Sequence, residues 1–266
     1  MKRFFIALLG LSAIGFYSFR TVSGKYADIL TSLGIPPALA KDLVSNSFIG
    51  GHFSQPRNPA YKTYPAGKRA EAVQQLGAFA KNYMMSAEFQ KRYAENYQQM
   101  TPETPKTMEQ RVKDQVDELK KQIKDNEESY KKVGNDLKPI IENNIKELKK
   151  MIASYEDKSN PQYARQMQSV KIMYDGDMQY YQQQMTALDK KFPKDVKQFI
   201  KMRLEEFLQL TSDIDFNAEL VQDGRLKRFA NPTYERKSMN WKYCFRAGKE
   251  TTDAARAFVQ QWLKEL

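Results

Sequence analysis

The strongest constraint on the fold is the recurrence of apolar residues, at alternating spacings of four and three, along two long segments. The first segment runs from Val112 to Ile140, and the second runs from Tyr163 to Phe192. This heptad spacing places apolar residues on one face of a helix, and such a face is stable when it packs against another apolar surface. The two segments therefore predict an antiparallel, coiled-coil-like helical hairpin over residues 101–193.

Proline and glycine residues indicate where these helices end or weaken. The sequence "DKSNP" at 157–161 is expected to form the turn between the two arms. The first arm is expected to kink or break between Gly134 and Pro139, where the apolar pattern shifts by one position. Gly176 weakens the second arm, because glycine costs about 1 kcal/mol relative to alanine inside a helix.

Amphipathic helical patterns also fill residues 25–100 and 194–266. Neither part has enough apolar surface to be stable alone, so we expect them to pack together as one helical body from which the hairpin projects. After Asp213 apolar and polar residues alternate, and a later Asp-Gly pair predicts a β-hairpin over about residues 213–230. The predicted fold class is mainly α, with one small β-hairpin near the C-terminus.

Residues 1–24 have the composition of a signal peptide. Lys2 and Arg3 precede an apolar run that ends at Phe19. This run is shorter than the roughly 20 apolar residues that a membrane-spanning helix needs. We therefore expect the protein to be exported, either to the periplasm or out of the cell. An N-terminal membrane anchor is the alternative, because no clear cleavage site follows the apolar run.

The chain is basic, with 43 Lys and Arg residues against 32 Asp and Glu residues and a net charge of +11. The positive charge is spread along the sequence, and no block of like charges marks a nucleic-acid-binding tail, so the sequence argues against a nucleic acid partner. It does allow an anionic envelope polymer as a partner. The single cysteine, Cys244, cannot form an intramolecular disulfide, and we interpret it as a small buried side chain.

The sequence contains few residues that could support catalysis or hold a metal. His52 is the only histidine and Cys244 the only cysteine, which excludes zinc sites built from several such ligands as well as iron–sulfur sites. No phosphate-binding loop or nucleophile-elbow motif is present. We therefore expect no metal and no cofactor, and a non-catalytic role is favoured over an enzymatic one.

The irregular segment "GGHFSQPRNPAYKTYPAGKR", residues 50–69, interrupts the helical pattern and contains the candidate ligand-binding residues. Its basic and aromatic side chains are suited to an anion, a glycan or a peptide carboxylate. The alternative is a structural loop held across the helices by its aromatic residues. The candidate residues are His52, Arg57, Tyr61, Lys62, Tyr64, Lys68 and Arg69.

The second arm of the hairpin contains the candidate partner-binding residues. Methionine and tyrosine side chains on one helix face can form an adaptable surface for another protein. The alternative is that they pack against the first arm. The residues are Met167, Tyr174, Met178, Tyr181 and Met185.

Together these patterns predict an exported, non-catalytic helical protein of the cell envelope that acts as a binding protein or scaffold. The hairpin is expected to bind a protein partner or to mediate self-association. One alternative is an enzyme of unrecognised type that uses the 50–69 loop around His52. Another is a binder of anionic lipid or polysaccharide, or a holdase-like chaperone; the likeness to periplasmic holdases lies in the helical architecture alone.

Overall fold

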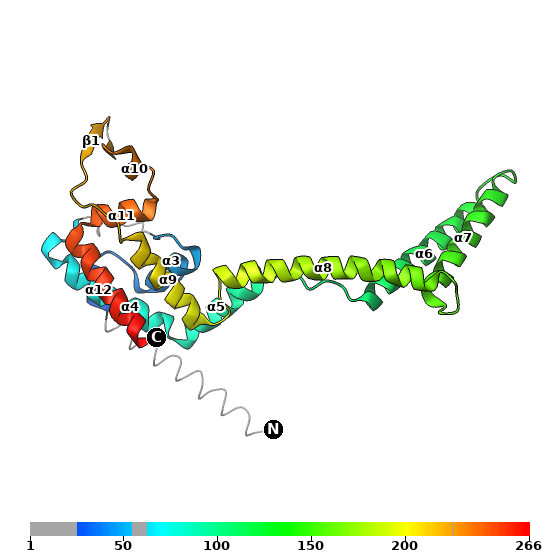
Figure 1. Cartoon of the computed structure of the whole chain (residues 1–266), viewed down its shortest axis with the longest axis horizontal. Helices are drawn as coiled ribbons and strands as arrows, with labels where there is room; N and C mark the ends of the chain where they lie inside the picture. Colours follow the sequence, from blue (N-terminus) through cyan, green and yellow to red (C-terminus); the bar gives the residue numbers. More distant parts are fainter. Residues whose placement is uncertain (1–25, 55–62, 225) are drawn as a thin grey trace, which may run out of the picture. The chain divides into compact units, whose positions relative to one another are not determined.

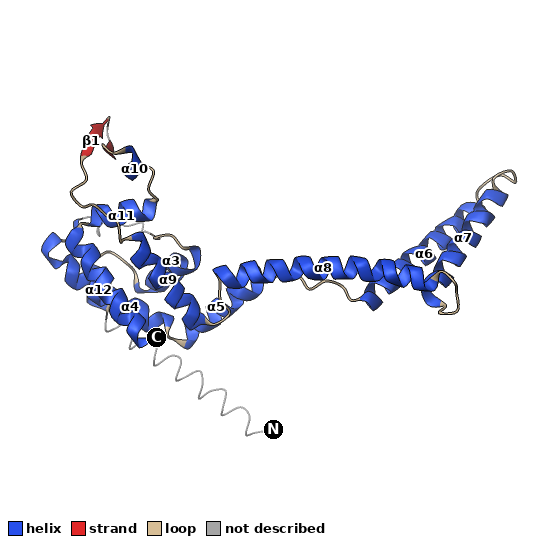
Figure 2. Cartoon of the chain, in the orientation of Figure 1, coloured by secondary structure: helices blue, strands red, loops and turns tan. Residues whose placement is uncertain are grey.

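The computed structural model describes residues 26–54, 63–224 and 226–266, and the signal peptide predicted at 1–24 lies outside these ranges. The fold is mainly α with one small antiparallel sheet, which confirms the predicted fold class (Figures 1 and 2). The chain divides into two compact units. Unit 1 comprises Met1–Gln99 with Phe192–Leu266, and unit 2 comprises Met100–Lys191. In the described ranges, no helix has both the length and the apolar composition to span a membrane.

Unit 2 consists of three helices, α6 (Met108–Tyr130), α7 (Lys138–Glu156) and α8 (Tyr163–Lys191). Helix α6 begins with a capping box, in which the Thr107 side chain accepts from the Gln110 backbone N–H and the Gln110 side chain accepts from the Thr107 backbone N–H.

Helices α6 and α7 run antiparallel. Tyr130 at the end of α6 donates a hydrogen bond of 2.6 Å to Glu142 near the start of α7. Lys120 lies 3.1 Å from Glu156 at the end of α7. The end of α6 therefore meets the start of α7, and an earlier part of α6 meets the end of α7, as in an antiparallel hairpin.

The chain reverses at 131–137. Residues 157–161 do form the predicted turn, in which Asn160 accepts from the Gln162 backbone N–H at 2.9 Å, but the chain does not reverse there, so the prediction that this turn joins the two arms of the hairpin is wrong. Arg111 near the start of α6 lies 2.7 Å from Asp177 in the middle of α8. Helix α8 therefore continues along α6 in the same direction as α7, and residues 157–162 break the returning arm without reversing it. The expected break between Gly134 and Pro139 is confirmed, but it is complete enough to reverse the chain. Pro139 lies in the first turn of α7, where it suits a helix start.

The apolar faces of these helices lie where the heptad pattern places them. The buried apolar residues of unit 2 are Val116, Leu119, Leu148 and Val170. By contrast, Leu137 and Ile140 are 52% and 58% exposed, because they lie at the turn. The apolar pattern thus selects the inward face of each helix, but it does not determine which helices become neighbours.

The substitution Gly176→Ala should stabilise unit 2. Gly176 lies inside α8, and a Cβ atom there would have no neighbouring atom within 4 Å. The free energy of unfolding is expected to rise by about 0.5–1 kcal/mol, because alanine restricts the unfolded chain and favours the helix. Chemical denaturation followed by circular dichroism measures this change. The matched control, Ala187→Gly at an exposed position of the same helix, should lower stability by a similar amount. No gain for Gly176→Ala would show that α8 is strained at this point.

Unit 1 combines helices from both ends of the sequence with the small sheet. Its N-terminal elements are α2 (Ala27–Ser32), α3 (Pro37–Gly50), the 3-10 helix η2 (Ala66–Lys68), α4 (Arg69–Met84) and α5 (Ala87–Met100). Its C-terminal elements are α9 (Val196–Leu210), β1 (Leu220–Asp223), β2 (Leu226–Phe229), α10 (Pro232–Glu235), α11 (Met239–Ala247) and α12 (Lys249–Glu265).

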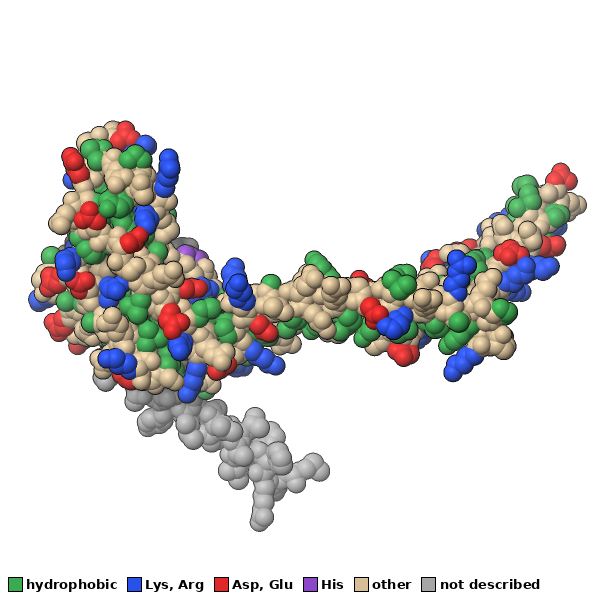
Figure 3. Space-filling view, viewed as in Figure 1, with side chains coloured by type: hydrophobic (Ala, Val, Ile, Leu, Met, Phe, Trp, Pro, Cys, Tyr) green, Lys and Arg blue, Asp and Glu red, His purple; other side chains and the backbone are tan. Residues whose placement is uncertain are grey.

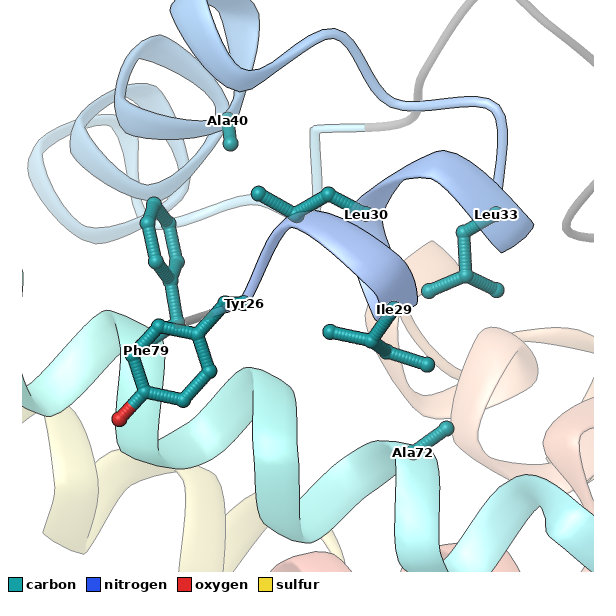
Figure 4. Packing of buried hydrophobic residues seen from close by; sticks show 7 residues of the cluster. All are labelled: Tyr26, Ile29, Leu30, Leu33, Ala40, Ala72 and Phe79. Atoms are coloured by element: carbon teal, nitrogen blue, oxygen red, sulfur yellow. The ribbon is translucent and has the colours of Figure 1, made fainter. Parts of the chain in front are cut away.

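The core of unit 1 joins the two ends of the sequence. Helix α12 packs along α4, where Gln74 donates to the carbonyl of Ala254 at 3.2 Å and Lys81 pairs with Glu265. On another side of α4, the short helix α2 adds a cluster of apolar side chains, in which the rings of Tyr26 and Phe79 meet edge to face (Figure 4). The buried residues of this cluster are Tyr26, Ile29, Leu30, Leu33, Ala40, Ala72 and Phe79.

The β-hairpin is confirmed, with Leu220 opposite Phe229 and Asp223 opposite Leu226. Gly224 in the turn has a φ of +59°, a conformation that favours glycine. The first strand is shorter than the alternation after Asp213 suggests. Residues 214–218 form a turn instead, because the Asp215 side chain accepts a hydrogen bond from the Asn217 backbone N–H at 3.0 Å.

Asp213 should make the stability of this region depend on pH. Its carboxylate pairs with Lys237 and accepts a 2.9 Å hydrogen bond from the Trp241 indole, and these contacts hold its pKa below the ordinary 3.8. A lowered pKa means that the stabilisation is complete above pH 3.8 and is lost as the pH falls through the lowered value. Near-UV circular dichroism should report this loss in acid. In Asp213→Asn the acid-dependent step should become smaller; an unchanged step would assign it to another carboxylate, such as Glu235, whose pKa is lowered by its hydrogen bond with Lys242.

Candidate functional site

Unit 1 contains an apolar cavity of about 580 Å³, which lies between α3, α4, α9 and α12. Several of its lining positions carry small residues, including Ala40, Gly77, Ala80 and Ala255, so the helices leave space between them. Larger apolar side chains form the rest of the wall. They are Leu30, Ile35, Leu43, Val44, Phe48, Phe53, Val73, Leu76, Phe79, Leu204, Phe207, Leu210, Phe258, Val259 and Trp262.

Hydrogen bonds fix the chain where α3 ends beside the cavity. Gly51 ends the helix with a φ of +67°, and its carbonyl accepts from the Asn240 side chain at 3.1 Å. The same Asn240 side chain accepts from the Phe53 backbone N–H at 3.1 Å, and Ser47 accepts from the Ser54 backbone N–H at 3.0 Å. Residues 51–54 are therefore attached to α3 and α11 on one side of the cavity.

Arg203 is the most unusual residue of the cavity wall, because its charged side chain is only 12% exposed. One terminal nitrogen donates to Glu206 at 2.7 Å, and the other donates to the carbonyl of Ile49 at 3.3 Å. The guanidinium also lies 5.8 Å and 5.2 Å from the ring centres of Phe192 and Phe199. These contacts hold the arginine in one orientation against α9.

Two buried N–H groups in this wall have no hydrogen-bond partner among the described residues. They are Nε of Arg203 and Nε1 of Trp262. The other tryptophan, Trp241, does have one, since its indole donates to Asp213. Both nitrogen atoms are enclosed by protein atoms, so Arg203 and Trp262 line the cavity with their other atoms. A buried donor without an acceptor costs about 1–3 kcal/mol.

The candidate residues of the 50–69 segment do not line this cavity where the structure describes them. His52 is exposed, and its Nδ1 lies 3.2 Å from the carbonyl of Gly50. Tyr64 is half-buried and packs against the apolar cluster of Figure 4, while Arg69 donates to its carbonyl at 3.3 Å. Lys68 is exposed. The remaining candidates, Arg57, Tyr61 and Lys62, lie outside the described residues.

The candidate partner-binding residues lie along one face of α8. All five are half-buried: Met167, Tyr174, Met178, Tyr181 and Met185. The most exposed large apolar side chains of α8 lie on the opposite side of the helix, since they are about 120–140° away at 100° per residue. Ile172, Met173 and Tyr180 are 65%, 58% and 63% exposed.

Cys244 is buried, as expected from its interpretation as a core residue. Burial raises the pKa of its thiol to about 11, so the thiol is protonated and unreactive at neutral pH. Among residues 26–54, 63–224 and 226–266, no group of three His, Cys, Asp or Glu side chains is placed to hold a metal ion. On the face drawn in Figure 3, basic and acidic side chains are interspersed over both units.

The sequence contains one signal that marks Arg203 as a buried charged residue. The apolar face of α9 includes Phe199, Ile200, Leu204 and Phe207, and Arg203 falls on that same face. A charged residue inside an apolar stripe needs partners when it is buried, so its position marks a polar feature in the core.

Comparison of the chain with protein-family models, with curated proteins and with solved structures finds no match.

Proposed function

We propose that this protein is a non-catalytic binding protein that holds a small apolar molecule in the cavity of unit 1. The observation that carries the proposal is the cavity itself. Its volume of about 580 Å³ falls within the range of roughly 300–1,000 Å³ that ligand sites commonly have. Apolar side chains dominate its wall, so a bound apolar molecule would gain hydrophobic stabilisation in proportion to the surface that it buries.

The charged groups of the cavity favour binding over catalysis. In the described part of the chain, its ionisable lining residues are Arg203 and Glu206, and these pair with each other. Neither is therefore poised as a free acid or base beside the apolar wall. The alternative of an enzyme centred on His52 has less support, because His52 does not line the cavity. The pattern of residues 1–24 further leads us to propose that the protein is exported and works in the cell envelope.

A substitution that fills part of the cavity should weaken binding. Ala255 on α12 lines the cavity, and a leucine there would occupy part of its volume. With the neutral fluorescent probe N-phenyl-1-naphthylamine, we expect saturable binding to the wild-type protein and at least tenfold weaker binding to Ala255→Leu. Fluorescence titration measures both affinities.

The matched control for this test lies two residues further along the same helix. Ala257 is exposed and does not line the cavity, so Ala257→Leu should bind the probe like the wild type. Thermal unfolding should show that both variants remain folded. The proposal fails if the wild type does not bind the probe, or if Ala255→Leu binds it as tightly as the wild type does.

A second candidate function, that of a scaffold, is supported by the exposed apolar side chains of α8. Ile172 and Tyr180 expose more than half of their surface to solvent. Large exposed apolar residues on one helix are typical of a surface that contacts another protein, whether a second copy of the chain or a separate envelope protein.

Light scattering on the purified protein tests the self-association form of this second candidate. A dimer or larger particle is expected, and Ile172→Asp should shift it towards the monomer because the substitution places a charge in the contact. Gln182→Asp, at an exposed and neutral position of the same helix, adds the same single negative charge and is the control. A wild-type protein that stays monomeric at high concentration would exclude self-association through α8, and crosslinking in the envelope would then test for a different partner.

A further inference from the structure

The exposed residues of the cavity wall indicate where the cavity meets solvent. Most of the described residues that line it are buried or half-buried, and those that are exposed are Gly51, Phe53 and Glu206. All three lie at the same end of the cavity, because Arg203 bonds to Glu206 on α9 and also to the carbonyl of Ile49 near the end of α3. A molecule that comes from solvent therefore has its shortest path into the cavity at this end.

The Phe53 side chain covers this end of the cavity. Its ring centre lies 6.5 Å from that of Phe207 on α9, and both rings line the cavity. Phe53 is 36% exposed, so part of its side chain faces solvent while the rest is covered by its neighbours. A side chain that borders both solvent and the apolar wall stands between the two.

The backbone that carries Phe53 is held by side chains of the neighbouring helices. Asn240 on α11 binds it twice, by donating to the Gly51 carbonyl and by accepting from the Phe53 N–H, both at 3.1 Å. Ser47 on α3 accepts from the Ser54 N–H at 3.0 Å. Residues 51–54 belong to no helix or strand, and a segment of this kind opens at a lower cost than a helix that is packed in the core.

We propose that residues 51–54 form a lid on the cavity, which Asn240 and Ser47 hold closed and which must open for a molecule to enter or leave. This inference rests on the function proposed above and specifies how access to its site is controlled. Gly51 is the hinge, because it lies directly after α3 and has a φ of +67°, a conformation that favours glycine. Since only the open form takes up a molecule, association is slowed by the fraction of time that the lid is closed.

Stopped-flow fluorescence with N-phenyl-1-naphthylamine tests the inference. Asn240→Ala removes two of the hydrogen bonds that hold the lid closed. The rate constants for association and dissociation of the probe should each rise at least fivefold, because the lid opens more often in both the free and the occupied protein. Ser47→Ala removes the third hydrogen bond and should raise both rate constants by a smaller factor. It decides the question if Asn240→Ala fails to fold.

The matched control removes an asparagine side chain that plays a similar local role away from the cavity. Asn231 accepts from the Thr233 backbone N–H at 2.9 Å at the start of α10, is exposed and does not line the cavity. Asn231→Ala should therefore leave both rate constants at their wild-type values.

The inference is overturned if a folded Asn240→Ala protein takes up the probe at the wild-type rate, because the probe then enters elsewhere. It is also overturned if dissociation alone becomes faster, since residues 51–54 would then be a fixed part of the wall that contacts the bound molecule. In both cases the probe still binds, and the proposed function stands. Failure of the probe to bind the wild-type protein would instead refute the proposed function.

Discussion

The structure of unit 1 depends on the packing of α12 against α4, which brings together residues that are far apart in the sequence. The helices approach closely at Gly77, since a Cβ atom there would lie 2.8 Å from the ring of Phe258. Glycine at this position lets the aromatic ring lie directly on the backbone of α4. The hydrogen bond from Gln74 and the ion pair between Lys81 and Glu265 lie along the same two helices. This contact buries the facing sides of α4 and α12, which lie near opposite ends of the sequence.

The cavity follows from this arrangement together with the small residues around it. Gly77 and Ala255 lie on the two helices that pack most closely, and both line the cavity. Helix α9 adds a third wall, on which Arg203 is held by Glu206 and by the carbonyl of Ile49. A polar group in this position is retained at a cost in desolvation, and that cost is offset only in part by its protein partners.

The sequence predicts the individual elements of this fold better than it predicts which elements pack against each other. The heptad spacing correctly identifies the inward faces of α6, α7 and α8, and the Asp-Gly pair correctly places the β-hairpin turn at Gly224. The predicted position of the hairpin turn is wrong, because the apolar face of one helix does not determine which other helix packs against it. The break before Pro139 is strong enough to reverse the chain, whereas the "DKSNP" segment only interrupts it.

The cavity could not be predicted from the sequence, because the residues that line it are spread from Leu30 to Trp262 and resemble ordinary core residues. What distinguishes them is how completely they fill the space between helices, and that depends on the packing of the whole unit. The irregular 50–69 segment is locally unusual in composition, but its described residues that line the cavity are Gly51, Phe53 and Ser54, none of which is a predicted candidate. The one local signal for the cavity was a charged residue, Arg203, within the apolar face of α9.

The most direct test of the central claim is a crystal structure of the protein under xenon pressure. Xenon enters apolar cavities that are not filled by side chains, and it needs no polar partner. The account predicts one or more xenon atoms between Leu76, Phe207 and Val259, with the surrounding helices unchanged. A crystal structure in which side chains close this space, and xenon is absent from it, would contradict the claim that unit 1 is built around a ligand cavity.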